Sequence, residues 1–115
     1  MLVQTNTYIV PASRRQHHAR LMRRFREALL RMGCDQFEIL EESGEHWSAG
    51  PDDVRCVQIM RFRDKQHHQA VQAAERTDTE SQALIKEFAS LIDLPAQAAR
   101  NQFAVHYYTT AAEPA

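Results

Sequence analysis

The chain has 115 residues, of which 43% are hydrophobic and 25% are charged, and its formal net charge is −1. These values are typical of one globular domain and leave no room for a second. No stretch approaches the roughly 18 continuous apolar residues of a membrane span. The N-terminus lacks a basic segment followed by an apolar run, which predicts no signal peptide and a cytoplasmic protein.

Charge is distributed unevenly along the chain. Residues 14–31 hold seven arginines and one acid, Glu27, whereas residues 35–53 hold seven acids and no Lys or Arg. A basic stripe can indicate nucleic-acid binding, but these arginines have no nearby aromatic platform and an acidic segment follows directly. We interpret them as a solvated helix face and expect neither nucleic-acid nor membrane partners. Cys34 and Cys56 are expected to be ordinary buried thiols.

The first half of the chain predicts a strand, a helix and a second strand. Residues 2–10 are rich in β-branched and aromatic side chains, and Pro11 ends this strand. Ser13, with Gln16 three residues later, predicts the helix N-cap. Apolar residues then recur at helical intervals until Gly33. Residues 34–42 alternate apolar and charged side chains, as a half-exposed strand does.

The second half predicts a strand, a broken helix and a final strand. A loop with Gly44, Gly50 and Pro51 precedes the strand at residues 54–62. Asp64 predicts the cap of a helix through residue 76, and the capping-box pattern at residues 77–80 restarts it. The helix is expected to end near residues 93–95. Residues 103–110 form a short aromatic strand.

This order of elements predicts an α+β protein with the ferredoxin-like βαββαβ split plan. A four-stranded antiparallel sheet carries both helices on one face. Residues 1–110 are expected to form the single domain, and residues 111–115 an unstructured tail. The other face of the sheet would be bare, so we expect a second copy of the chain to cover it as a homodimer.

Two identical tripeptides, Gln16-His17-His18 and Gln66-His67-His68, lie in the first turns of the two helices. Adjacent helical residues diverge by about 100°, so each pair is poorly placed to bind one metal ion, and no further ligand spacing completes a site. His18 and His67 are expected to lean toward the apolar side. We interpret the tripeptides as an echo of the duplicated plan, or as chance, and expect no metal.

The segments "VQTNTYIV" and "HHARLMRRF", with the later run "VQIMRFRDKQHHQAVQAAERTDTESQALIKEFASLI", resemble the antibiotic biosynthesis monooxygenase family and its haem-degrading relatives. The resemblance implies a dimeric α/β barrel that binds a small molecule, and Asn6 matches the family's first-strand Asn. It implies oxidation of an aromatic or polyketide-like compound without a cofactor. Val71 stands near the position of the haem branch's Trp, and Ile85 and Phe88 stand near its haem-ligating His, which argues against haem degradation.

Strand alternation predicts which side chains line the barrel interior. Asn6 and Tyr8 in the first strand, and His106 and Tyr108 in the last, are expected to face it together. The strand at residues 54–62 fits either orientation. Trp47 is a candidate to close the pocket, or a packing anchor. The polar groups fit a substrate site or a network at the dimer interface, so an oxidoreductase and a non-catalytic ligand-binding or interaction module both remain open.

Overall fold

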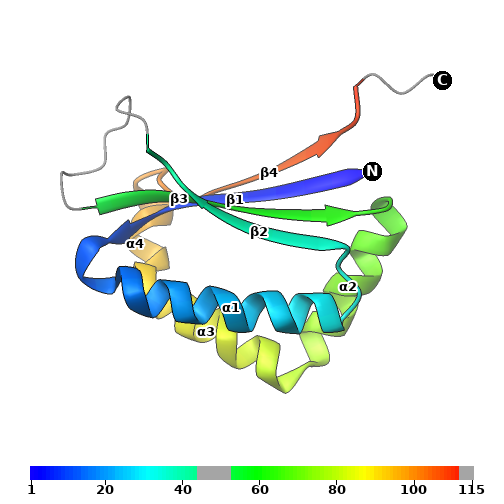
Figure 1. The fold of residues 1–115 in the computed structure, drawn as a ribbon, viewed down its shortest axis with the longest axis horizontal. Coiled ribbons are helices and arrows are strands. Elements are labelled where there is room, and N and C mark those ends of the chain that lie inside the picture. The colour runs from blue at the N-terminus through cyan, green and yellow to red at the C-terminus, as the bar shows by residue number, and fades with distance from the viewer. Residues whose placement is uncertain (44–52, 112–115) are drawn as a thin grey trace.

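The computed structural model describes residues 1–43 and 53–111. Its strands are β1 (Leu2–Pro11), β2 (Gln36–Glu41), β3 (Asp53–Phe62) and β4 (Ala104–Thr109). Its helices are α1 (Arg15–Arg31), α2 (Lys65–Thr77), α3 (Thr79–Ile92) and α4 (Leu94–Ala99), with a 3-10 turn at Ala12–Arg14. The strands form one antiparallel sheet in the order β2-β3-β1-β4. Figure 1 shows α1, α2 and α3 on one side of this sheet, so the predicted fold class is confirmed.

The strand register decides which side chains face the helices. In β1 and β3, Asn6 lies opposite Gln58 and Tyr8 lies opposite Cys56. Residues that lie opposite each other in an antiparallel pair share a face. Tyr8, Cys56 and Gln58 are buried, so the even-numbered residues of β1 and β3 point toward the helices.

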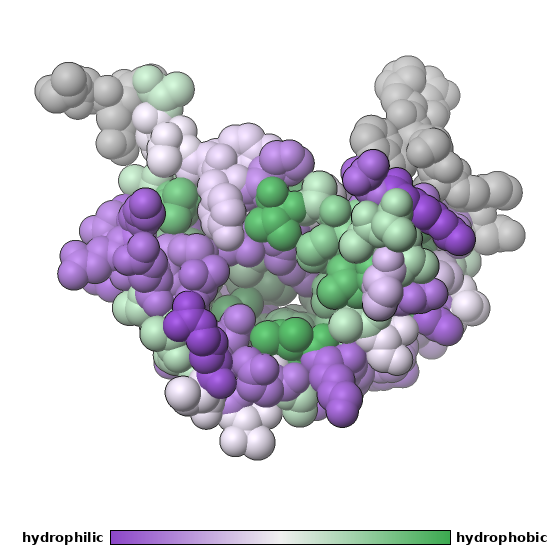
Figure 2. Space-filling view, turned by 180° about the vertical axis from the view of Figure 1, so that it is seen from behind, coloured by the Kyte–Doolittle hydropathy of each residue, from purple (hydrophilic) through white to green (hydrophobic). Residues whose placement is uncertain are grey.

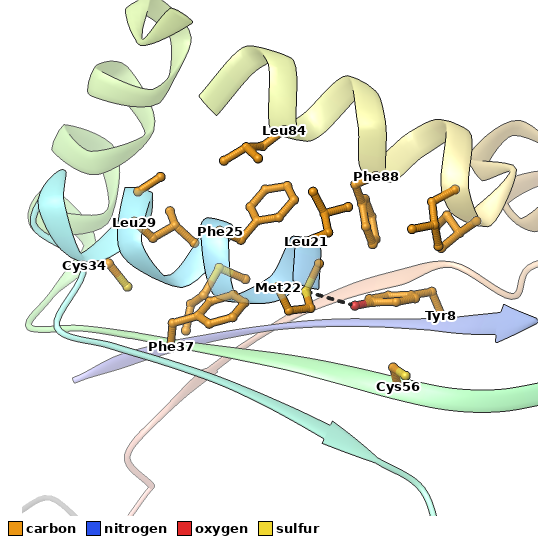
Figure 3. Close-up of a cluster of buried hydrophobic side chains, with 14 of the residues drawn as sticks. Tyr8, Leu21, Met22, Phe25, Leu29, Cys34, Phe37, Cys56, Leu84 and Phe88 are labelled. Carbon is orange, nitrogen blue, oxygen red and sulfur yellow. Dashed lines mark hydrogen bonds between the residues drawn. The ribbon is translucent and has the colours of Figure 1, made fainter. Parts of the chain in front are cut away.

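The hydrophobic core fills the space between the sheet and the helices. Figure 3 shows Leu21 and Phe25 of α1 pointing toward Phe88 and Leu84 of α3, above Tyr8 of β1. The Tyr8 and Phe88 rings meet edge to face with centroids 4.8 Å apart. Full burial of each such side chain contributes about 1.5–3 kcal/mol, so this layer is a main source of stability.

The helix ends test the predicted caps. The predicted Ser13 cap is wrong, because Ser13 lies inside the 3-10 turn and α1 begins after Arg14 without a side-chain cap. The Asp64 cap is confirmed, since its Oδ1 accepts from the His67 backbone N–H at 2.8 Å. The predicted break between α2 and α3 is also confirmed. Its cap is Asp78, which accepts from the Ser81 backbone N–H at 2.9 Å.

Helix α4 was not predicted from the sequence. It begins at Leu94, with Pro95 in its first turn, where the missing backbone N–H costs nothing. Its buried Gln97 joins the helix to β1, because Nε2 donates to the Ile9 carbonyl at 2.7 Å and Oε1 accepts from the Ile9 N–H at 2.9 Å. The same Nε2 donates to the Ile92 carbonyl at 2.6 Å. One side chain therefore fixes α4 against both the sheet and the end of α3.

Candidate functional site

Hydrogen-bonded side chains form a continuous row along the helix-facing side of β1 and β3. His68 Nε2 donates to Gln4 Oε1 at 2.9 Å, and Gln4 Nε2 donates to Asn6 Oδ1 at 3.1 Å. Asn6 Nδ2 then donates to Gln58 Oε1 at 2.9 Å. Residues 4 and 6 share a face because side chains alternate along a strand. The register adds Gln58, and three amides lie side by side.

This row continues into a buried tyrosine–histidine pair. Gln58 Nε2 donates to Tyr8 Oη at 3.1 Å, and Tyr8 Oη lies 2.7 Å from His18 Nε2. Tyr8 and His18 are 0% and 3% exposed. Tyr8 Oη accepts from Gln58 and has one proton to donate, and the short distance favours His18 Nε2 as its acceptor over Met22 Sδ, which lies 3.7 Å away. Burial lowers the pKa of His18 to about 4 and raises the pKa of Tyr8 far above its ordinary value, so both groups are neutral at pH 7.

All the hydrogen bonds of this polar row donate in the same direction, from His68 toward His18. Hydrogen bonds that run in one direction polarise one another, which strengthens each of them. The three amides accept and donate without changing protonation at neutral pH. The row therefore holds its members in fixed orientations, and it is unsuited to carrying protons along its length.

The repeated histidine pairs have four distinct roles. His18 and His68 are the two ends of the polar row. His17 lies at the surface, with Nε2 3.0 Å from Glu87 Oε2. His67 Nε2 donates to the Gly33 carbonyl at 2.7 Å, and its Nδ1 accepts from the Arg63 backbone N–H at 3.0 Å. The expected inward position of His18 is observed, and the His67 side chain is also largely covered, at 7% exposure, while His68 is buried as well.

Within residues 1–43 and 53–111, no group of three or more His, Cys, Asp or Glu side chains is arranged to hold a metal ion. The same part of the chain contains no helix that is long and apolar enough to cross a membrane. Cys34 and Cys56 are buried free thiols. The cavity described next is lined by amides, apolar and aromatic side chains, and one carboxyl group.

A cavity of about 240 Å³ lies between the polar row and the helices. Figure 2 shows a hollow on the rear side of the molecule, with apolar side chains around it. The cavity wall combines polar groups from the sheet with a larger apolar and aromatic surface from all layers. Its lining is Gln4, Asn6, Phe25, Leu29, Gln58, Met60, Phe62, Val71, Gln72, Glu75, Ile85, Phe88, Leu94 and Phe103. Such a mixture suits a small, mainly apolar molecule that carries a few polar groups.

Glu75 of α2 is a member of this wall that sequence reasoning missed. Burial raises the pKa of its carboxyl group, and the neighbouring Arg76 lowers it to a smaller extent. The signal was present in the sequence, because Glu75 follows Val71 by four residues and therefore shares its side of the helix. From the sequence, no functional residue is predicted in this helix.

A second pocket, of about 590 Å³, lies at the edge of the sheet. Its wall includes His68, Leu2, Tyr107 and Gln72. Gln72 lines both pockets, and the His68–Gln4 hydrogen bond joins a residue of the edge pocket to a residue of the inner cavity. The two spaces therefore adjoin at α2.

The predicted site residues do not form one group. Asn6 lines the inner cavity, and Tyr8 lies buried beside it in the polar row. His106 lies opposite Thr5, and Tyr108 lies opposite Val3, so both point to the other face of the sheet. The expectation that these four side chains face one interior is wrong for Asn6 and Tyr8. Trp47 lies outside the described residues.

The reason for this error is the polarity of the inner face. Strand alternation predicts that the set containing Asn6 and Tyr8 faces the barrel interior, away from the helices. The structure reverses this assignment, because Asn6 and Tyr8 are satisfied by side chains from β3 and α1. The assignment for β4 was correct: Val105 lies opposite Asn6 on the helix side, and His106 lies on the open face.

No protein-family model matches the chain, and no curated protein matches it. Solved structures do. A NIPSNAP domain protein from Burkholderia xenovorans superposes with a TM-score of 0.63 at 14% identity, covering 100% of this chain and 99% of that protein. A "putative antibiotic biosynthesis monooxygenase" from Deinococcus radiodurans gives a TM-score of 0.59 at 12% identity, with 100% and 97% covered.

A protein from Agrobacterium tumefaciens gives a TM-score of 0.64 at 12% identity, with 97% of this chain and 95% of that protein covered. At such identities the likeness concerns the fold, and function must be argued from the site. The resemblance seen in the strand and helix sequences is thus supported at the level of architecture. The chain has the ferredoxin-like fold that the antibiotic biosynthesis monooxygenase-like proteins share.

Proposed function

We propose that this protein binds a small aromatic molecule in the cavity between its sheet and its helices. The observation that carries the proposal is the row of Gln4, Asn6 and Gln58 amides facing a wall of phenylalanine rings. The Asn6 nitrogen uses one N–H on Gln58, which leaves its second N–H for a ligand oxygen. The rings supply a flat apolar surface on which an aromatic ligand stacks.

A second candidate function is oxidation of this ligand by dioxygen without a cofactor. It is favoured by the position of Asn6, which matches the first-strand Asn of the monooxygenase family and lines the cavity. In such chemistry the electron-rich ring of the substrate reacts with oxygen, and the protein orients it. The alternative is a non-catalytic ligand-binding or interaction module that uses the same cavity.

Turnover separates these two functions. Phenols and anthrone-like compounds are incubated with the protein under oxygen, and ligand binding is followed by NMR chemical shifts. Asn6→Ala is expected to weaken binding and any oxidation, whereas Thr5→Ala, on the opposite face of the same strand, leaves both unchanged. Binding without oxygen consumption favours the binding module. If Asn6→Ala binds every compound as the native protein does, the cavity is not the site.

The proposed assembly is a homodimer, formed in the cytoplasm through the bare face of the sheet. On this face, Leu40 and Tyr108 are 50% and 53% exposed, and Val57 and Ile59 lie between them on β3. Figure 1 shows no described helix on this side of the sheet. An apolar patch of several hundred Å² contributes several kcal/mol when buried, at about 25 cal/mol per Å². Light scattering at micromolar concentration is expected to show twice the chain mass of 13.3 kDa.

A further inference from the structure

Glu75 is a charged side chain on an otherwise uncharged cavity wall. It lies four residues after Val71, which is buried at 3% exposure, so the two residues share the cavity-facing side of α2. Among the described residues that line the cavity, Glu75 is the one with an ionisable side chain. The amides of Asn6 and Gln58 on the sheet side are neutral.

Within the part of the chain that the structure describes, the Glu75 carboxyl group makes no hydrogen bond or ion pair, and its charged neighbour is Arg76, the next residue of α2. Several other acids on the helices and the sheet are paired, among them Glu41 with Arg15, Asp78 with Arg31, and Glu87 with Arg24. An unpaired carboxylate next to apolar surface is unfavourable, and a cation beside it would remove that cost.

The walls near this carboxylate also favour a cation. Phe25, Phe88 and Phe103 line the cavity, and an aromatic ring attracts positive charge to its face. No Lys or Arg side chain lines the described wall, so an anionic ligand would find no countercharge there. Positive charge on the ligand therefore agrees with both the carboxylate and the rings.

We propose that Glu75 determines the specificity of this cavity, and that its ligand is a small aromatic molecule carrying a protonated nitrogen. The nitrogen contacts the Glu75 carboxylate, the ring packs on the phenylalanines, and the amides of Asn6 and Gln58 receive any further polar groups. This inference rests on the proposed ligand-binding function and names the class of compound that the same cavity takes.

Three probes of one shape test the charge preference: benzylamine, which is protonated at neutral pH, neutral benzyl alcohol and anionic benzoate. Binding is measured at pH 7.5 by NMR chemical shifts. The native protein is expected to bind benzylammonium about tenfold tighter than benzyl alcohol, the effect of one cation paired with a carboxylate and aromatic faces. Benzoate should bind more weakly than either. Glu75→Gln should lose most of this preference and keep only the part that the aromatic faces supply.

Glu27→Gln is the matched control, because it removes the same charge from the exposed side of α1; it should keep the tenfold preference. Equal binding of benzylammonium and benzyl alcohol by the native protein overturns the role of Glu75 while leaving the aromatic cavity in place. Binding of none of the three probes overturns the proposed function together with this inference. The native protein alone decides the first question, so the result stands even where Glu75→Gln folds poorly.

Discussion

Acidification is expected to weaken the fold through His18. This histidine is 3% exposed, and its Nε2 accepts a hydrogen bond from the Tyr8 hydroxyl. Protonation of the ring would remove that acceptor. Burial lowers its pKa from 6.5 to about 4. Between these two values the unfolded chain binds a proton that the folded protein does not. The free energy of unfolding therefore rises with pH between these two values. The stability that the neutral histidine provides is lost as the pH falls through this window.

The size of the effect follows from the two pKa values. Each unit between the two pKa values is worth about 1.4 kcal/mol once the pH has fallen below both of them. Between pH 7 and pH 5, where the folded histidine stays mostly neutral, the linkage relation gives a loss of about 2 kcal/mol. A protein of this size has a total stability of about 5–15 kcal/mol, so this loss is measurable.

Urea unfolding at pH 7 and pH 5 measures the effect, with His18→Gln as the comparison. Glutamine keeps an acceptor for the Tyr8 hydroxyl but does not titrate, so the variant should lose about 2 kcal/mol less than the native protein over this interval. His68, whose pKa burial also lowers, is present in both proteins and cancels. Parallel pH dependences for the two proteins would show that the Tyr8–His18 pair does not hold a neutral histidine.

Three other perturbations test separate parts of the structure. Gln97→Ala should lower the free energy of unfolding by about 2–3 kcal/mol, because it leaves the buried Ile9 N–H and carbonyl without partners. Urea unfolding measures this loss, and Gln66→Ala, at an exposed position of α2, is the control. Ile59→Glu on the bare sheet face should convert the expected dimer to a 13.3 kDa monomer in light scattering. Cys56, whose pKa burial raises to about 12, should react with a thiol reagent only after unfolding, and rapid native labelling would contradict its burial.

The fold was predictable because its signals are local. Apolar spacing identifies α1, and the Asp64 cap marks the start of α2 at a single residue. Element order then selects the sheet topology from few alternatives. Helix α4 escaped prediction because its anchor is Gln97, a polar side chain that reaches 88 residues back along the chain to Ile9. No local sequence pattern predicts such a contact.

The site was harder to predict because it reverses an ordinary rule. A strand with alternating polar and apolar side chains usually turns its polar set away from the core. In β1 the polar set faces the helices, and it is tolerated there because Gln58 and His18 complete its hydrogen bonds. These partners lie 52 and 10 residues away from Asn6 and Tyr8, respectively. The orientation of β1 therefore depends on long-range pairing that hydrophobic periodicity does not encode.

The polar row also limits the chemistry that this site can perform. Both of its ends are neutral histidines, and its middle consists of amides, which hold protons in place at neutral pH. Under the proposed function, a reaction in the cavity would therefore exchange protons with solvent or with Glu75, and the row would orient the ligand. In the proposed site, the paired strands β1 and β3 contact the ligand's polar groups, and Glu75 of α2 supplies the charge. Helix α2 also borders the edge pocket.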